Sequence, residues 1–142
     1  MKSILSLEGL LIGFFLLSAG KAGGEEWKFI CQDDEGSWFY DAETAKPLSD
    51  SRFRVQTKKM YGPKAVSAAV HKYGGKYGNL DHVLARWEID CLQRKFKLCS
   101  AVFHSRGKAV IEEYDAEPGG GFPPEEIPPD SYLDLLRRKI CP

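Results

Sequence analysis

Four cysteines are the residues of this chain whose types and positions most clearly suggest chemistry. Cys91 ends a run over 86–91 that alternates as a strand does, and Cys141 ends a short amphipathic pattern that is typical of a helix. A Cys91–Cys141 disulfide would clamp this helix onto a sheet and close a loop of about 50 residues, which restricts the unfolded chain by roughly 4 kcal/mol in the chain-entropy model. An even number of cysteines without C-x-x-C spacing favours two structural disulfides, so we expect no metal site. If only one bond forms, we expect Cys31 and Cys99 to stay thiols.

The three histidines could support acid–base catalysis only if the fold brings one of them to a carboxylate. His71, His82 and His104 fall on a predicted helix, a loop and a strand end, and Asp81 precedes His82. The sequence contains no G-x-S-x-G, H-E-x-x-H or phosphate-binding glycine motif. We therefore predict no catalytic residue, no cofactor and no enzyme activity. The alternative is a small periplasmic hydrolase that uses His82 or His104 with a carboxylate.

A basic stretch is the strongest candidate for ligand binding. Seven lysines and arginines, and no acidic residue, lie between positions 52 and 76. Strand alternation places Arg52, Arg54 and Lys58 on one face, where such a row attracts an anionic polymer, an acidic protein surface or lipid headgroups. The alternative is an ordinary solvated sheet face whose charge is offset by acids of neighbouring strands. Most of the tryptophans and phenylalanines are expected in the core.

The N-terminus has the pattern of a secretory signal peptide over residues 1–22. Lys2 precedes an apolar segment over 10–17, and small residues lead to a cleavage position after Ala22. We expect an exported, periplasmic or extracellular protein with one domain over 23–142 and no membrane span after cleavage. An uncleaved N-terminal anchor is the alternative. Because 20 Lys and Arg balance 20 Asp and Glu, nucleic-acid binding is not expected.

The residues above must be positioned by short strands and two helices. Periodicity and turn residues predict strands over 27–31, 37–40, 52–58, 85–92, 95–104 and 109–114, and helices over 63–73 and 131–140. Residues 77–82 are expected to form a loop and 117–130 an extended linker. Consecutive strands joined by short turns favour an antiparallel meander, so we predict an α+β fold with six strands and an inserted helix.

The order and spacing of several residues resemble the surface-adhesin protein E family of bacterial exported proteins. They are Trp27, Asp34, Trp38-Phe39-Tyr40-Asp41, Arg54-Val55, Trp87-Glu88-Ile89-Asp90-Cys91, Gly107, Ile127-Pro128-Pro129, Leu133 and Cys141. The most specific part is the W-E-I-D-C strand, followed by a proline-led helix that ends in cysteine. The resemblance covers about 27–142. It implies a six-stranded antiparallel sheet whose concave face holds the C-terminal helix through a Cys91–Cys141 disulfide.

Two features depart from the family pattern. No cysteine for lipid attachment follows the apolar segment, and Cys31 and Cys99 look like an added pair that bridges the first strand to the fifth. The resemblance, together with the lack of catalytic motifs, predicts an exported adhesin-like binding module of the bacterial cell envelope. Its expected partner is a protein or an extracellular polymer, and pairing of an edge strand could give a homodimer. A purely structural envelope protein is the remaining alternative.

Overall fold

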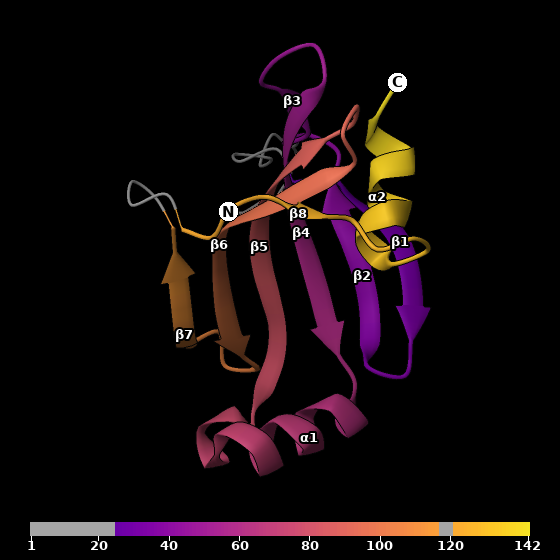
Figure 1. Cartoon of the computed structure of the whole chain (residues 1–142). Coiled ribbons are helices and arrows are strands. Elements are labelled where there is room, and N and C mark those ends of the chain that lie inside the picture. Colours follow the sequence, from indigo (N-terminus) through magenta and orange to yellow (C-terminus); the bar gives the residue numbers. More distant parts are fainter. Residues whose placement is uncertain (1–24, 117–120) are drawn as a thin grey trace, which may run out of the picture.

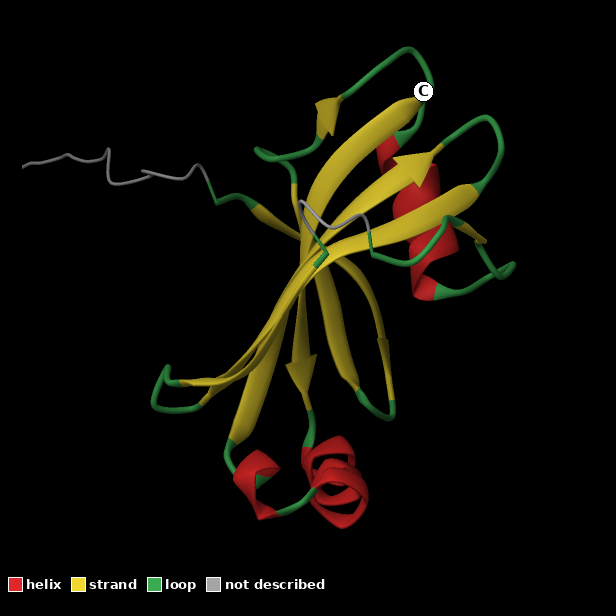
Figure 2. Cartoon of the chain, turned by 60° about the vertical axis from the view of Figure 1, so that its left-hand side comes forward, coloured by secondary structure: helices red, strands yellow, loops and turns green. Residues whose placement is uncertain are grey.

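Residues with alternating burial form the strands of one twisted antiparallel sheet, shown in a computed structural model (Figures 1 and 2). The structure describes residues 25–116 and 121–142. The predicted signal peptide, and positions 117–120 of the predicted linker, therefore lie outside the described residues.

Six strands pair antiparallel in the order β1-β2-β4-β5-β6-β7, which confirms the α+β class and the meander. They are β1 (Trp27–Asp33), β2 (Gly36–Asp41), β4 (Arg52–Tyr61), β5 (Leu80–Asp90), β6 (Lys95–Ser105) and β7 (Val110–Asp115). Two further strands of two residues each, β3 (Lys46–Pro47) and β8 (Glu125–Glu126), pair with β4 and β6.

Two helices and a short 3-10 turn complete the fold. Helix α1 (Pro63–Tyr73) and the turn η1 (Gly75–Tyr77) lie at one end of the sheet, and α2 (Tyr132–Ile140) lies across one of its faces (Figure 1). Proline starts α1, and Gly74, with φ 112°, ends it by donating its N–H to Val70. Neither helix in the described part of the chain is long and apolar enough to cross a membrane.

The sheet has a face covered by α2, here called the α2 face, and an opposite open face. The α2 face carries the core, in which Val55, Trp87 and Ile89 of the sheet pack with Leu133 and Leu136 of α2. Because alternate residues of a strand point to opposite sides, the neighbours of the buried residues on β4 and β5 form the open face.

A β-bulge changes the face assignment of β6. Trp87 pairs with Leu98 but Arg86 pairs with Ser100, so Cys99 is an additional residue between the two pairs. Strict alternation predicts Leu98 and Ala101 on opposite sides of the sheet. The bulge instead puts both on the α2 face, where they join the core.

Two segments predicted as irregular contribute to the sheet or to the core. β5 begins at Leu80, inside the predicted loop over 77–82, and Leu80 is buried with Val66 and Tyr77. In the predicted linker, Ile127 is 8% exposed and belongs to the core, and its N–H donates to the carbonyl of Arg94. The part of the linker around Ile127 therefore packs on the α2 face.

The Cys91–Cys141 disulfide is present, with a Cα–Cα distance of 5.8 Å. The second expected disulfide is not formed, since Cys31 and Cys99 stay thiols. They lie on β1 and β6, which are four strand spacings apart, or about 19 Å along the sheet. A disulfide needs Cα atoms within about 7 Å.

A polar cluster fixes the start of α2. Ser131 caps the helix by accepting the N–H of Asp134. The Asp134 carboxylate accepts the N–H of Asp130 and hydrogen bonds from Arg137 and Arg138. These contacts, led by the one from the Asp130 backbone, lower the pKa of Asp134.

The cysteine assignment predicts a specific thiol count. In protein unfolded without reductant, we expect a thiol reagent to modify two cysteines, identified by mass spectrometry as Cys31 and Cys99. Paired Cys91→Ser and Cys141→Ser substitutions should lower the free energy of unfolding in urea by roughly 4 kcal/mol, because the unfolded chain loses its cross-link. Cys31→Ser is the matched control and should have a much smaller effect. Modification of all four cysteines, or of none, would contradict the assignment.

The Asp134 cluster predicts a dependence of stability on pH. Because folding lowers the pKa of Asp134 below its unfolded value of about 3.9, the stabilisation is complete above about pH 5 and is lost as the pH falls through the folded-state pKa. Asp134→Asn should therefore reduce stability at neutral pH and flatten its decline in acid, measured by urea unfolding at a series of pH values. Asp50→Asn, at an exposed aspartate outside this cluster, is the control. Parallel acid profiles for Asp134→Asn and the natural protein would refute this role.

Candidate functional site

The predicted basic row lies on the open face, but its members have local partners. Arg52 and Arg54 bind the two carboxylate oxygens of Glu88 on β5, at 3.1 and 2.9 Å. Burial opposes ionisation of Glu88, yet the hydrogen bonds from the two arginines outweigh it and lower its pKa. The ammonium of Lys58 lies 4.6 Å from the centre of the Trp27 ring. Each member of the basic row therefore already contacts a neighbouring side chain.

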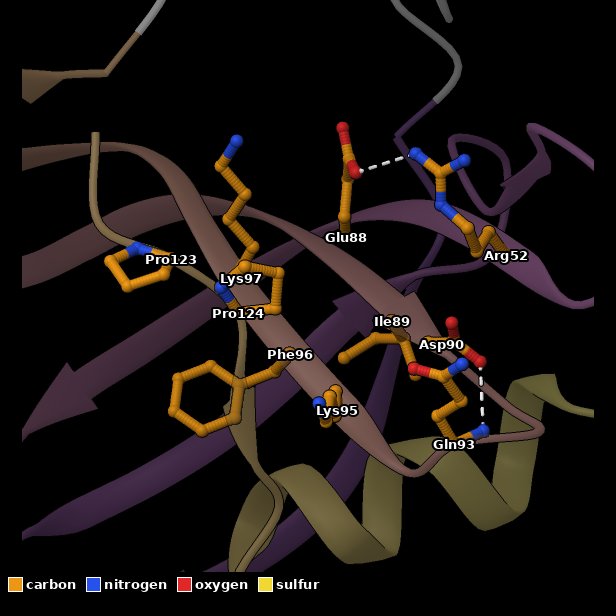
Figure 3. Close-up of a pocket in the computed structure, with 10 residues that line it drawn as sticks. All are labelled: Arg52, Glu88, Ile89, Asp90, Gln93, Lys95, Phe96, Lys97, Pro123 and Pro124. Atoms are coloured by element: carbon orange, nitrogen blue, oxygen red, sulfur yellow. Dashed lines mark hydrogen bonds and ion pairs between the residues drawn. The ribbon is translucent and has the colours of Figure 1, made fainter. Parts of the chain in front are cut away.

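Arg52 also lines a cavity of about 490 Å³ at the end of the β5–β6 hairpin (Figure 3). Figure 3 shows Glu88 between Arg52 and Lys97, with Pro123 on the far side of Lys97. The charged residues that line this cavity include both cations and carboxylates. This cavity therefore offers no field of a single sign to an anionic ligand.

A second hollow lies on the α2 face, and aromatic side chains line it together with small apolar residues and a few charged ones. Beside α1 it has a volume of about 520 Å³, and a smaller hollow of about 170 Å³ continues it toward α2. The two share Lys59, Tyr61 and Phe103, so we treat them as one groove between the helices. We call it the aromatic groove and define it by Trp38, Lys59, Tyr61, Tyr73, Tyr77, Phe103 and Tyr132.

Lys59 is the only charged residue in the part of the groove shared by both hollows, and it is 7% exposed. Its ammonium lies 4.3 Å from the centre of the Trp38 ring and 4.7 Å from that of Tyr61. Glu35, at the tip of the β1–β2 turn, pairs with it at 2.6 Å. Two ring faces and one carboxylate therefore replace the water that a buried ammonium loses.

Sequence reasoning missed Lys59 because the strand was expected to end at Lys58. Continuing the alternation of Val55 and Thr57 by one step places Lys59 on the buried face, between two aromatic neighbours. Lys59 could have been found by continuing the alternation of this strand beyond the charged residue Lys58.

Tyr77 and Tyr61 form the α1 end of the groove. The Tyr77 hydroxyl donates to the carboxylate of Glu112 on β7, and Lys76 lies 3.5 Å from the same carboxylate. The hydrogen bond to Glu112, with burial, raises the pKa of Tyr77 to about 12. Burial, with the charge of Glu35, raises the pKa of Tyr61 to about 12 as well. Both groups therefore stay neutral donors at physiological pH.

Two of the three histidines come together on the open face. His82 and His104 are cross-strand partners, with ring centres 4.8 Å apart and planes inclined by 16°. Asp81 accepts a hydrogen bond from Nδ1 of His82 at 2.8 Å. His71 lies exposed on α1. Neither His82 nor His104 lines the cavities described above, so the pair has no adjoining substrate cleft there.

Comparison of the chain with family models, curated proteins and solved structures finds no match. The resemblance to the surface-adhesin protein E family therefore stays a prediction.

The hydrogen bond between Tyr77 and Glu112 predicts that the titration of Tyr77 depends on Glu112. Because folding raises the pKa of Tyr77 from about 10 to about 12, the stability that it contributes is present below pH 10 and is lost as the pH rises toward 12. Glu112→Gln removes the accepting charge, so the tyrosinate absorbance of one residue should appear at lower pH. Glu113→Gln is the control, since Glu113 pairs with Val102 and faces the open side. Equal titration curves for Glu112→Gln and the natural protein would count against the Tyr77–Glu112 bond.

Proposed function

We propose that this protein is an exported, non-enzymatic binding module of the bacterial cell envelope that holds a protein partner in the aromatic groove. The observation that carries the proposal is an uncovered hollow with aromatic walls around a buried lysine. Tyrosine and tryptophan dominate the binding energy of protein interfaces, because they bury large areas while keeping a polar atom for hydrogen bonding.

The rim of the groove gives a partner both apolar and polar contacts. Tyr73 on α1 is 61% exposed, and Lys72 and Glu112 lie beside it along the groove. The groove floor on β4 and β6 belongs to the rigid centre of the sheet, so little ordering accompanies binding. Such a surface suits a partner that inserts an apolar side chain into the groove and places polar groups beside it.

Export is supported by two independent features. The sequence begins with a signal-peptide pattern, and the domain contains a disulfide of the kind that persists in oxidising compartments. Together with the resemblance to the surface-adhesin protein E family, they support an envelope location and an adhesin-like role.

The hydrolase alternative has one observation in its favour, the His82–His104 pair with Asp81. A general base also needs a site in which a substrate is held within hydrogen-bond reach. We therefore favour binding over catalysis. Hydrolysis of ester or phosphodiester substrates that is lost in His82→Gln would reverse this preference.

A site-specific crosslinking experiment tests the groove as the binding surface. With a photoreactive amino acid at Tyr73 of the full chain in its native cells, we expect a discrete protein adduct. Lys59→Met should abolish it, because the ammonium is removed while chain length and packing are kept. Because the Glu35 side chain is 65% exposed and regains water when its partner is removed, Lys59→Met leaves no buried unpaired charge and should keep the free energy of unfolding within about 1 kcal/mol.

The same reagent at Leu92, which is 80% exposed on the β5–β6 turn, is the control and should give no such adduct. An adduct of twice the chain mass would identify the partner as a second copy, and a carbohydrate adduct would identify it as a polymer. Equal adducts at Tyr73 and Leu92, unchanged by Lys59→Met, would refute the groove.

A further inference from the structure

We propose that His82, His104 and Met60 form a binding site for Cu(I) on the open face of the sheet. This site is separate from the aromatic groove and does not depend on the proposed function. Met60 pairs with His82 across β4 and β5, and His82 pairs with His104 across β5 and β6. The three residues therefore form one cross-strand row, in which the Cβ atoms of neighbours are about 5 Å apart.

The two histidines are stacked close enough that both can contact one ion once one ring rotates. The ring centres are 4.8 Å apart, so rotation of one ring lets a single ion reach a nitrogen of each. Asp81 accepts the Nδ1 proton of His82, which leaves Nε2 as the lone-pair nitrogen. A carboxylate behind a ligating histidine fixes the tautomer and makes the free nitrogen a better donor.

The chemistry of the donors selects the metal. The thioether is a soft ligand that selects Cu(I), and imidazole binds copper as well, whereas Zn(II) in structural sites requires four donors. Among the described residues no three His, Cys, Asp or Glu side chains converge to hold a metal, so a site here needs the thioether of Met60. Leu84 and Val102, the next cross-strand pair on this face, give the row an apolar flank that suits a singly charged ion.

The sequence offers a direct reporter, because Met60 is the only methionine besides Met1. We would titrate Cu(I) anaerobically into the full chain carrying Cys31→Ser and methyl-labelled methionine, in competition with a chromogenic chelator. The substitution removes the more exposed of the two thiols as a competing ligand, since Cys99 is only 2% exposed. We expect the Met60 methyl resonance to shift and to saturate at one equivalent of copper.

Substitutions then assign each ligand. His82→Gln, His104→Gln and Met60→Leu should each weaken Cu(I) binding by at least tenfold, and Asp81→Asn by about tenfold through the orientation of His82. His71→Gln on α1 is the matched control and should leave the affinity unchanged. A Met60 methyl resonance that does not move would overturn the proposal, whatever the variants do. Equal weakening by His71→Gln, or Zn(II) bound as tightly as Cu(I), would overturn it as well.

Discussion

The bond between Cys91 and Cys141 determines where the C-terminal helix lies, and the two surfaces of the sheet follow from that. It joins the end of β5 to the end of α2, while Leu133 and Leu136 pack into the core and Tyr132 stacks on Trp38 at 3.6 Å between ring centres. Because α2 has only nine residues, it covers one end of its face and leaves the rest to the aromatic groove. The same tether leaves the opposite face of the sheet uncovered by either helix (Figure 2).

Strand alternation then gives adjacent residues of β4 different roles. Lys58 points to the open face and lies over Trp27, whereas Lys59 points into the aromatic groove between Trp38 and Tyr61. On the open face Arg52 and Arg54 pair with Glu88, and Met60 lies opposite His82 in the strand register. One sheet therefore offers an aromatic surface on one side and a row of metal-binding side-chain types on the other.

Local periodicity and the cysteine positions were enough to predict the meander, both helices and the Cys91–Cys141 bond. The Cys31–Cys99 pairing was wrong because it ignored the lateral distance that the predicted strand order itself implies. The candidate sites could not be predicted, because they depend on which residues pair across neighbouring strands, and the sequence does not show this register. His82 meets His104 only because β5 starts at Leu80, and the bulge at Cys99 moves Ala101 into the core.

Residue-resolved amide hydrogen exchange, compared between oxidised and reduced protein, tests the tether most directly. If the bond holds α2 on an otherwise independent sheet, reduction should strip protection from the amides of α2 far more than from those of β4, β5 and β6. Uniform loss across the sheet, or unchanged protection of α2, would show that the helix is held by something other than this bond.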